Sequence, residues 1–420
     1  MKRLSVTKEQ VHVISAVTFG NILEWFEVYL FAYLSPIIAE NFFHFKLHGS
    51  NLFLSLLIFG VGFITRPIGG LIFGRIGDLF GRKKAFLWSI ITLTIPTFLM
   101  GLLPTYEKWG IFAPISLFVL RLLQSIPTGG EIPGVICYLY ENAGQNNKRF
   151  ITSWNAVGNQ IGALVGLCEI FIMENYMSRE SMVSWGWRIS FLSGGIIGLI
   201  GIYLRHSLYE TPVFLKLKES YKIDKEGIRQ FIVNYRKKIM IGTAFGVIDA
   251  AAFYLIATYV PIFIGINLCL SNNENLLVSC IILIVTTIFL PIFGRLGDKY
   301  SNKAMCVGSA LFILLLLYPL NIAINNNDMV LLSIIGGLSL IPLTCITALI
   351  AYLLGDLFPS QVRFTGIGIS ANLADGIIGG FTPAIAILLL QLTGNPASFC
   401  WYILCCATIS LFSYLMYIKK

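Results

Sequence analysis

Two acidic side chains, Glu24 and Glu27, lie in a largely apolar stretch near the start of the 420-residue chain. Because they are three residues apart, both fall on one face of a helix, and Asn21 continues that face. An unpaired ionised side chain at the centre of a bilayer costs at least ~3 kcal/mol on insertion scales. We therefore expect both carboxylates to face a water-filled cavity. The alternative is a structural hydrogen bond to a neighbouring helix.

Two arginines within apolar stretches, Arg66 and Arg121, are candidate partners for the buried acids. A helix rises 1.5 Å per residue, so Glu24 lies ~20 Å from the start of its span. Arg121 lies ~16 Å from the start of its own span, which begins on the opposite side of the membrane. Both are then near the middle of a hydrocarbon core ~30 Å thick. Since a buried charge needs a countercharge, we predict a pair between Glu24 and Arg121. The same arithmetic predicts a second pair between Arg66 and Glu131.

The second half of the sequence places Asp249 and Asp375 near mid-depth, with Asn372 one turn before Asp375 and Tyr254 close to Asp249. These residues could bind substrate or a proton, although polar contacts between helices would explain them slightly better. Four aromatic residues could cradle an ammonium group or pack between helices: Trp25, Tyr29, Tyr138 and Trp154.

The composition places these residues in an integral membrane protein. Hydrophobic residues make up 56% of the chain and charged residues 12%, about half the charged share of a soluble domain. A helix needs about 20 apolar residues to cross a bilayer. On that criterion the sequence predicts an all-α fold with twelve transmembrane helices, at roughly 11–40, 51–73, 84–104, 110–141, 150–173, 187–206, 237–266, 275–294, 303–322, 328–356, 363–391 and 396–418. We see no cleavage site typical of a signal peptide, so the first span is expected to be retained.

The longest polar stretch, 207–236, divides the spans into six and six. We predict an N-terminal six-helix bundle at 1–206, an inter-bundle loop at 207–236 and a C-terminal six-helix bundle at 237–420. Most of the 30 Lys and Arg fall on the side of the chain termini, which predicts that both termini are cytoplasmic. The net charge of +9 is thereby explained by membrane orientation, which argues against nucleic-acid binding.

An internal repeat supports two pseudo-symmetric halves. The loop 74–84, Gly-Arg-Ile-Gly-Asp-Leu-Phe-Gly-Arg-Lys-Lys, follows the second span, and 294–303, Gly-Arg-Leu-Gly-Asp-Lys-Tyr-Ser-Asn-Lys, follows the eighth. A weaker echo pairs Arg149-Phe-Ile-Thr with Arg363-Phe-Thr-Gly. Duplicated halves in a membrane chain are typical of transporters that bind substrate between the halves near the midplane.

The loop 74–84 resembles the signature of the major facilitator superfamily. Further stretches resemble its metabolite:proton symporter branch, which includes proline/betaine, α-ketoglutarate, citrate and shikimate carriers: Gly20–Glu27, Arg66–Gly70, Arg121–Gln124 with Gly129–Glu131, Gly186–Arg188, Glu210–Pro212 and Phe358–Arg363. The second loop copy departs from the pattern, because it lacks the Gly-Arg-Lys ending. Osmosensory members of the branch carry a coiled-coil tail; this sequence ends directly after the last predicted span, so we do not expect osmosensing by such a tail.

Charged loop residues are predicted to act at the interface between the halves. Asp78 can accept hydrogen bonds from a helix N-terminus across that interface, and Arg82 can reach Glu141. The glycines of the loop 74–84, Gly74 among them, allow a tight turn, and Asp298 is the second-copy counterpart of Asp78. The resemblance implies that this cluster holds the outward-open state as a conformational latch.

The resemblance implies proton-coupled import of a small organic metabolite by alternating access, in a bacterial inner membrane and as a monomer. Two acids with Arg121 suit a zwitterion such as proline or betaine, whereas a dicarboxylate would prefer more cations. An organic-acid:proton symporter is therefore the alternative, with an efflux carrier and a non-transporting sensor more remote. The sequence shows no nucleotide-binding loop, no metal-ligand spacing among its Cys and His residues and no catalytic constellation, so we expect no cofactor, no metal and no enzymatic activity.

Overall fold

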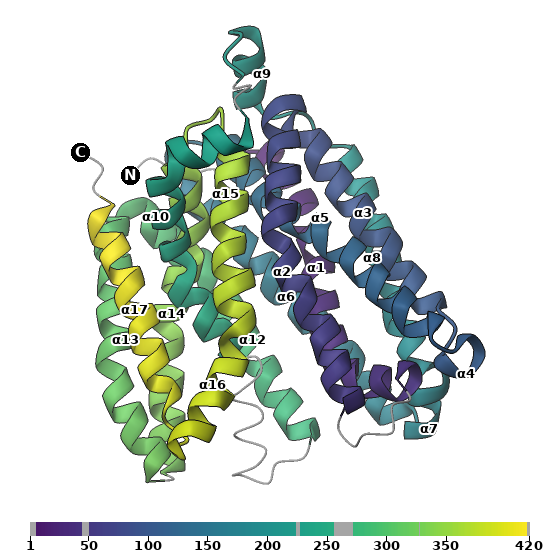
Figure 1. Cartoon of the computed structure of the whole chain (residues 1–420). Coiled ribbons are helices and arrows are strands. Elements are labelled where there is room, and N and C mark those ends of the chain that lie inside the picture. Colours follow the sequence, from purple (N-terminus) through teal and green to yellow (C-terminus); the bar gives the residue numbers. More distant parts are fainter. Residues whose placement is uncertain (1–5, 44–49, 224–226, 256–271, 327, 418–420) are drawn as a thin grey trace.

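The computed structural model describes residues 6–43, 50–223, 227–255, 272–326 and 328–417. Its long helices form two groups that stand side by side (Figure 1). The first group comprises α1 (Lys8–Phe42), α2 (Ser50–Phe80), α3 (Arg82–Leu102), α5 (Phe112–Asn142), α6 (Lys148–Tyr176) and α8 (Trp187–His206). The second comprises α10 (Ile228–Tyr254), α12 (Asn272–Lys299), α13 (Asn302–Asn325), α14 (Met329–Leu357), α17 (Phe399–Met416) and a span built from α15 (Arg363–Asn372), the π-helix η3 (Leu373–Gly379) and α16 (Gly380–Thr393).

Short elements join the long helices. They are α4 (Tyr106–Trp109), α7 (Arg179–Ser181), the π-helix η1 (Met182–Gly186) and α9 (Pro212–Glu219). In Figure 1, α9 lies at the end of the molecule where the two chain ends are marked. We call this end the terminus face. The second group of helices begins with α10 at Ile228, earlier than the predicted span start at 237.

Helix boundaries follow local sequence signals. The side chain of Thr7 accepts a hydrogen bond from the backbone of Gln10, and Gln10 reaches back to the backbone of Thr7, which forms a capping box at the start of α1. At the end of α16, Gly394 adopts φ 64°, in the left-handed region that favours glycine. Within the described residues, ten helices are long and apolar enough to span a membrane. The prediction of an all-α membrane fold is confirmed.

Glycines bring α6 close to α1, as the four-residue spacing of Gly158, Gly162 and Gly166 predicts. A Cβ atom at Gly158 would lie 3.0 Å from the carbonyl oxygen of Thr18, and one at Gly162 would collide with the carbonyl of Ile22. Any larger side chain at these positions would push the two helices apart. This close approach fixes the rotation of α1, the helix that carries Glu24 and Glu27.

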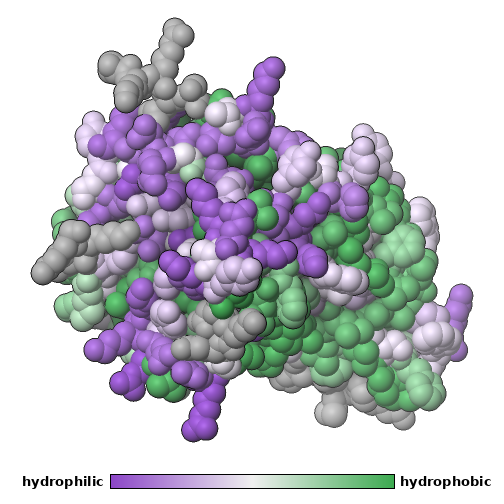
Figure 2. Space-filling view, turned by 90° about the horizontal axis from the view of Figure 1, so that it is seen from above, coloured by the Kyte–Doolittle hydropathy of each residue, from purple (hydrophilic) through white to green (hydrophobic). Residues whose placement is uncertain are grey.

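The polar and apolar surfaces are separated. Seen from above in Figure 2, the terminus face shows many hydrophilic side chains, and hydrophobic ones gather beside them. Side chains such as Ile196, Leu199, Ile281 and Leu315 are exposed on the long helices. An exposed apolar belt of this kind is what a lipid-facing surface requires.

Candidate substrate and proton site

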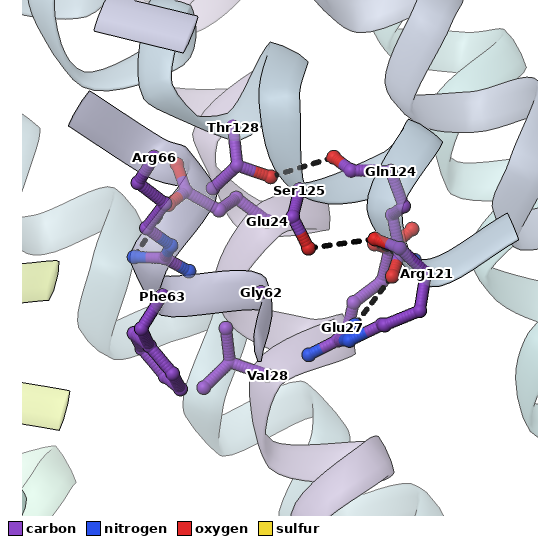
Figure 3. A pocket seen from close by; sticks show the side chains of 10 residues that line it. All are labelled: Glu24, Glu27, Val28, Gly62, Phe63, Arg66, Arg121, Gln124, Ser125 and Thr128. Carbon is purple, nitrogen blue, oxygen red and sulfur yellow. Dashed lines mark hydrogen bonds and ion pairs between the residues drawn. The ribbon is translucent and has the colours of Figure 1, made fainter. Parts of the chain in front are cut away.

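Glu24 on α1 faces Arg66 on α2. The Arg66 Nη1 atom lies 3.5 Å from Glu24 Oε1, and the two side chains are 4% and 1% exposed (Figure 3). Neither carboxylate oxygen of Glu24 accepts a hydrogen bond from the described part of the chain. The predicted pair between Glu24 and Arg121 is wrong, because the structure pairs Glu24 of α1 with Arg66 of α2.

Glu27 is linked to Arg121 through a third residue, Gln124. The Gln124 Nε2 atom donates to Glu27 Oε2 at 2.5 Å, and Gln124 Oε1 accepts from Arg121 Nη1. Thr97 on α3 donates its hydroxyl to Glu27 Oε1. The Arg121 guanidinium also lies over the Phe31 ring, 4.4 Å from its centroid. All four polar side chains of this network are buried.

Glu131 on α5 forms an ion pair with Arg205 on α8, so the predicted pair between Glu131 and Arg66 is also wrong. Arg205 Nη1 lies 2.8 Å from Glu131 Oε2, Nη2 contacts Oε1, and Ser89 donates to Oε2 at 2.8 Å. The Arg205 guanidinium lies over the Phe86 ring at 3.6 Å. Both charged side chains are fully enclosed, which makes this pair a structural element inside the first group of helices.

A small cavity joins the Glu24 and Glu27 networks. The centre of a water molecule can move within about 10 Å³ of it, which is room for about one water molecule. Figure 3 shows the side chains of α1, α2 and α5 that surround it. The lining residues are Glu24, Glu27, Val28, Gly62, Phe63, Arg66, Arg121, Gln124, Ser125 and Thr128. Two carboxylates and two guanidinium groups thus border one space deep within the helices.

The second group of helices approaches the same cavity through aromatic and polar residues. The Tyr254 ring lies 5.4 Å from the ring of Phe63, which lines the cavity. Asn372 donates to the carbonyl oxygen of Gly129 at 2.8 Å, a bond that joins the two groups. Asp249 accepts from Thr347 on α14, the kind of contact between helices that was the favoured explanation for it. Asp375 lies on the π-helix η3, an element often found at functional sites.

The four candidate aromatic residues fall in two places. Trp25 and Tyr29 lie edge-on to Phe253 of α10, with ring centroids 4.9 and 6.3 Å apart, so both stand between the two groups of helices. Tyr138 is a correction: it is fully buried against Phe86, and its hydroxyl donates to the carbonyl of Tyr209.

Trp154 packs edge-on against Phe150 of α6. It also packs against the apolar cluster that contains Leu290 of α12 and Ala348 of α14, so it stands between the two groups of helices as well. It does not line the small cavity, and a contact of Trp154 with an ammonium group stays a prediction.

Comparison with known proteins agrees with this geometry. Residues 13–234 match the family described as sugar (and other) transporter. The glycine betaine/proline/ectoine/pipecolic acid transporter OusA of Dickeya dadantii is 30% identical over 95% of this chain and 81% of its own. The protein belongs to this transporter family. The citrate-proton symporter of Klebsiella pneumoniae is 32% identical, over 93% of this chain and 87% of its own.

The family fold is also shared with solved structures. The proton:xylose symporter XylE, a major facilitator superfamily protein, superposes with a TM-score of 0.81 over 98% of this chain and 96% of its own, at 15% identity. The predicted major facilitator fold is therefore confirmed. The described residues contain six long helical segments in each of the two groups, and ten of these twelve meet the length and apolarity needed to span a membrane. The transporter family also agrees with the expectation that the chain is not an enzyme.

At the terminus face, the two halves of this transporter are joined through Asp78 of α2. Its carboxylate accepts from the backbone N–H groups of Phe364 and Thr365 at 3.2 and 2.9 Å, and from the Thr365 hydroxyl at 2.6 Å. These are the free donors at the N-terminus of α15. A Cβ atom at Gly74 would lie 2.7 Å from Thr365 Cα, so a side chain there would separate the same helices. The predicted contact of Asp78 with a helix N-terminus is present.

Arg82 and Glu141 extend this junction. Arg82 lies 3.4 Å from Glu141, the contact that was predicted, and it also lies 3.0 Å from Asp78. Glu141 also pairs with Arg363 of α15 at 2.8 Å, so the cluster alternates acids and arginines across the two halves.

Asp298 of α12 repeats the contact in the opposite sense. It accepts from the backbone N–H groups of Arg149 and Phe150, at the N-terminus of α6, at 2.9 and 3.0 Å. The Arg149 side chain lies 3.8 Å from the Asp298 carboxylate. The internal repeat in the sequence therefore corresponds to two equivalent junctions between the halves.

Sequence reasoning missed Gln124 and Arg205. Gln124 stands three residues after Arg121, so helical spacing could have placed it on the arginine's face. Arg205 stands at the end of a predicted span, where it reads as a charge that sets orientation. The structure instead turns it inward to Glu131.

Proposed function

We propose that this transporter is a proton-coupled symporter that imports a small zwitterion such as betaine or proline by alternating access. The observation that carries the proposal is the cavity in which Glu24 faces Arg66 and Glu27 is linked to Arg121. Acids can take up the proton, and a guanidinium can bind a substrate carboxylate. Trp25 and Tyr29 stand beside this region and suit an ammonium group.

Glu24 is the first candidate for proton uptake. Its two oxygens are buried and lack hydrogen-bond donors within the described residues. An unsatisfied buried carboxylate is costly, and either a proton or a donor on a bound solute relieves that cost. The transporter of Dickeya dadantii, named for glycine betaine and proline, supports the same substrate class.

Import of an organic acid is the second candidate. Two arginines, Arg66 and Arg121, border the same cavity, and the 32% identical relative is named a citrate-proton symporter. Once Glu24 and Glu27 are protonated, this cavity would carry a positive charge that suits a carboxylate-rich solute.

We place the terminus face in the cytoplasm of a bacterial inner membrane, with the chain working as a monomer. The Asp78 and Asp298 junctions then close the cytoplasmic side. In this assignment Asp78, Arg82, Glu141, Gly74 and Asp298 form the latch of the outward-facing state.

The test is uptake into proteoliposomes with an imposed inward proton gradient. Labelled glycine betaine, proline and citrate are supplied in parallel, with and without a protonophore. We expect gradient-dependent accumulation of a zwitterion, and we expect Glu24→Gln to abolish it. Glu169→Gln is the matched control, because Glu169 accepts from Ser193 on α8 and does not line the cavity.

Each other outcome changes the conclusion. Accumulation of citrate alone selects the organic-acid candidate. Accumulation that survives the protonophore, or an unchanged Glu24→Gln variant, contradicts proton coupling through this acid. Export without uptake would identify an efflux carrier, and binding without any flux a sensor.

A further inference from the structure

Pro133 leaves one backbone carbonyl of α5 without its helical partner. In an α-helix, the N–H of each residue donates to the carbonyl oxygen four residues earlier. Proline has no N–H, and its ring crowds that carbonyl. Gly129 stands four residues before Pro133 inside α5, and it is buried. Its carbonyl oxygen therefore needs a donor from elsewhere in the protein.

Asn372 of the second half supplies that donor. Its Nδ2 atom lies 2.8 Å from the Gly129 carbonyl oxygen and 2.6 Å from the carbonyl oxygen of Gly368, one turn earlier on its own helix. The Asn372 side chain is 0% exposed. An amide nitrogen carries two N–H groups, so Asn372 donates once within its own half and once to the first half.

Three glycines leave room for this bond. A Cβ atom at Gly70 of α2 would lie 2.8 Å from Asn372 Nδ2 and 2.5 Å from the Gly368 carbonyl oxygen. One at Gly368 would lie 2.6 Å from the Gly70 carbonyl oxygen, and one at Gly129 would lie 2.0 Å from the carbonyl oxygen of Arg66. Real Cβ atoms essentially never come within 3.0 Å of such atoms. The backbones of α2, α5 and α15 thus meet directly, and Figure 1 shows α15 beside α2.

This contact lies between the cavity and the terminus face. On α2, Arg66 lines the cavity, Gly70 comes one turn later, and Asp78 follows in the last turn of the helix, at the terminus face. On α5, Thr128 lines the cavity and Gly129 follows it toward the same face. The three glycines and Asn372 therefore form a layer of their own, deeper than the Asp78 junction. We call this layer the inner gate.

We propose that Asn372 pins the inner gate: its bond to Gly129 holds the two halves together below the cavity while the terminus face is closed, and it breaks when that face opens. Donor and acceptor belong to different halves, so a separation of α15 from α5 breaks the bond, whereas the bond to Gly368 moves with the second half. An interaction made in one state alone shifts the equilibrium toward that state. This inference rests on the proposed alternating access.

The gate can open without leaving a polar group unsatisfied. Glycines present no interlocked side chains, and water entering the open gate can donate to the Gly129 carbonyl in place of Asn372. Because the bond is exchanged for one with water, its net effect is about fivefold in the equilibrium between closed and open states.

Opening is measured with a cysteine on the cavity side of the gate, Thr128→Cys. A membrane-impermeant maleimide is added to inside-out vesicles without solute, and the same protein without the reporter gives the baseline. Asn372→Ala should raise the labelling rate about fivefold, since labelling needs the open state. Asn41→Ala is the matched control, because Asn41 donates to Ile37 and Val183, both at 2.9 Å and both within the first half. Its rate should change less than about twofold.

Gly368→Ala tests the gate through a different contact. The added methyl group meets the backbone of Gly70, so it should push α15 away from α2 and raise the labelling rate at least about fivefold. Gly337→Ala on α14 is its control, because no atom lies within 4 Å of the added Cβ. Melting temperatures show that each variant is folded.

Pro133→Ala tests the origin of the acceptor. The new residue has an N–H that can donate to the Gly129 carbonyl within α5. In this background, Asn372→Ala should raise the labelling rate less than about twofold, because the carbonyl keeps a partner in the closed state. A full fivefold effect would overturn the role given to Pro133.

The remaining outcomes separate the gate from the proposed function. Unchanged labelling in folded Asn372→Ala and Gly368→Ala variants would overturn the gate. Unchanged labelling with weaker binding of labelled glycine betaine in Asn372→Ala would make Asn372 a solute contact, which also overturns it. Because labelling needs no solute, faster labelling in the variants together with no gradient-driven uptake by the unchanged protein would refute the symporter assignment alone.

Discussion

Removing either member of the enclosed Glu131–Arg205 pair should strongly destabilise the protein. Glu131→Gln leaves Arg205 without its countercharge, and Arg205→Met leaves Glu131 with Ser89 as its remaining donor at 2.8 Å. Both side chains are 1% exposed or less, so water cannot replace the lost partner. Breaking a buried pair from one side costs about 3–5 kcal/mol.

The double variant should lose much less than the sum of the single variants. With Glu131→Gln and Arg205→Met combined, no uncompensated charge remains, and replacing a whole buried pair is often close to neutral. We expect a coupling energy of at least about 3 kcal/mol between the two positions. Reversible unfolding by SDS in mixed micelles, followed by circular dichroism, gives the free energies.

A second cycle, with Arg66→Met in place of Arg205→Met, tests the partner assignment. Arg66 pairs with Glu24 in the structure, so its coupling to Glu131 should stay below about 1 kcal/mol. The reasoning is refuted if Glu131 couples more strongly to Arg66 than to Arg205, or if Glu131→Gln costs less than about 1 kcal/mol.

Three further outcomes test the packing between helices and halves. Asp78→Asn removes the charge at the N-terminus of α15 and should weaken the junction by about 1–2 kcal/mol. Maleimide should then label a Ser153→Cys reporter faster, because Ser153 is buried between the halves beside Gly294. An unchanged labelling rate would count against the latch. Gly162→Leu should destabilise by about 1–3 kcal/mol through overpacking, measured as a lower melting temperature, while Gly308→Leu, at a site with no atom within 4 Å of the new Cβ, should not. Cys168 on α6 and Cys280 on α12 are neighbours across the halves, so copper-phenanthroline and dioxygen should cross-link them and stop uptake until a thiol is added. An equal effect in Cys168→Ser would disprove that the two thiols are close.

The sequence predicted how deep each charged side chain lies in the membrane but not which neighbouring helix it faces. Residue counting placed Glu24 and Arg121 near mid-membrane, yet a partner also depends on how each helix is rotated, and that rotation comes from contacts such as Gly162 against Ile22. Glu24 therefore meets Arg66. Arg205 was misread for a related reason: a basic residue at a span end serves orientation unless tertiary packing turns it inward.

The junction residues were easier to predict. The predicted loop is wrong at Asp78, which lies in the last turn of α2. The prediction still held because Asp78 is at a known end of its helix, and an acid near a helix N-terminus is stabilised by the partial positive charge there. The repeat also tied Asp298 to the same role. Asp249 and Asp375 stayed open because their surroundings depend on helices far away in the sequence, and part of the neighbouring segment, 256–271, lies outside the described residues.

The two acid-to-helix junctions run in opposite senses, since the first half gives Asp78 to α15 and the second half gives Asp298 to α6. Reciprocal contacts of this kind define an interface with two-fold symmetry, in which one surface patch serves both partners. A chain of half this length, carrying one such acid and one such helix start, would have what it needs to dimerise with itself in parallel orientation. Joining two copies end to end would make both junctions intramolecular, so each copy could then differ in sequence, as the loop copies 74–84 and 294–303 do.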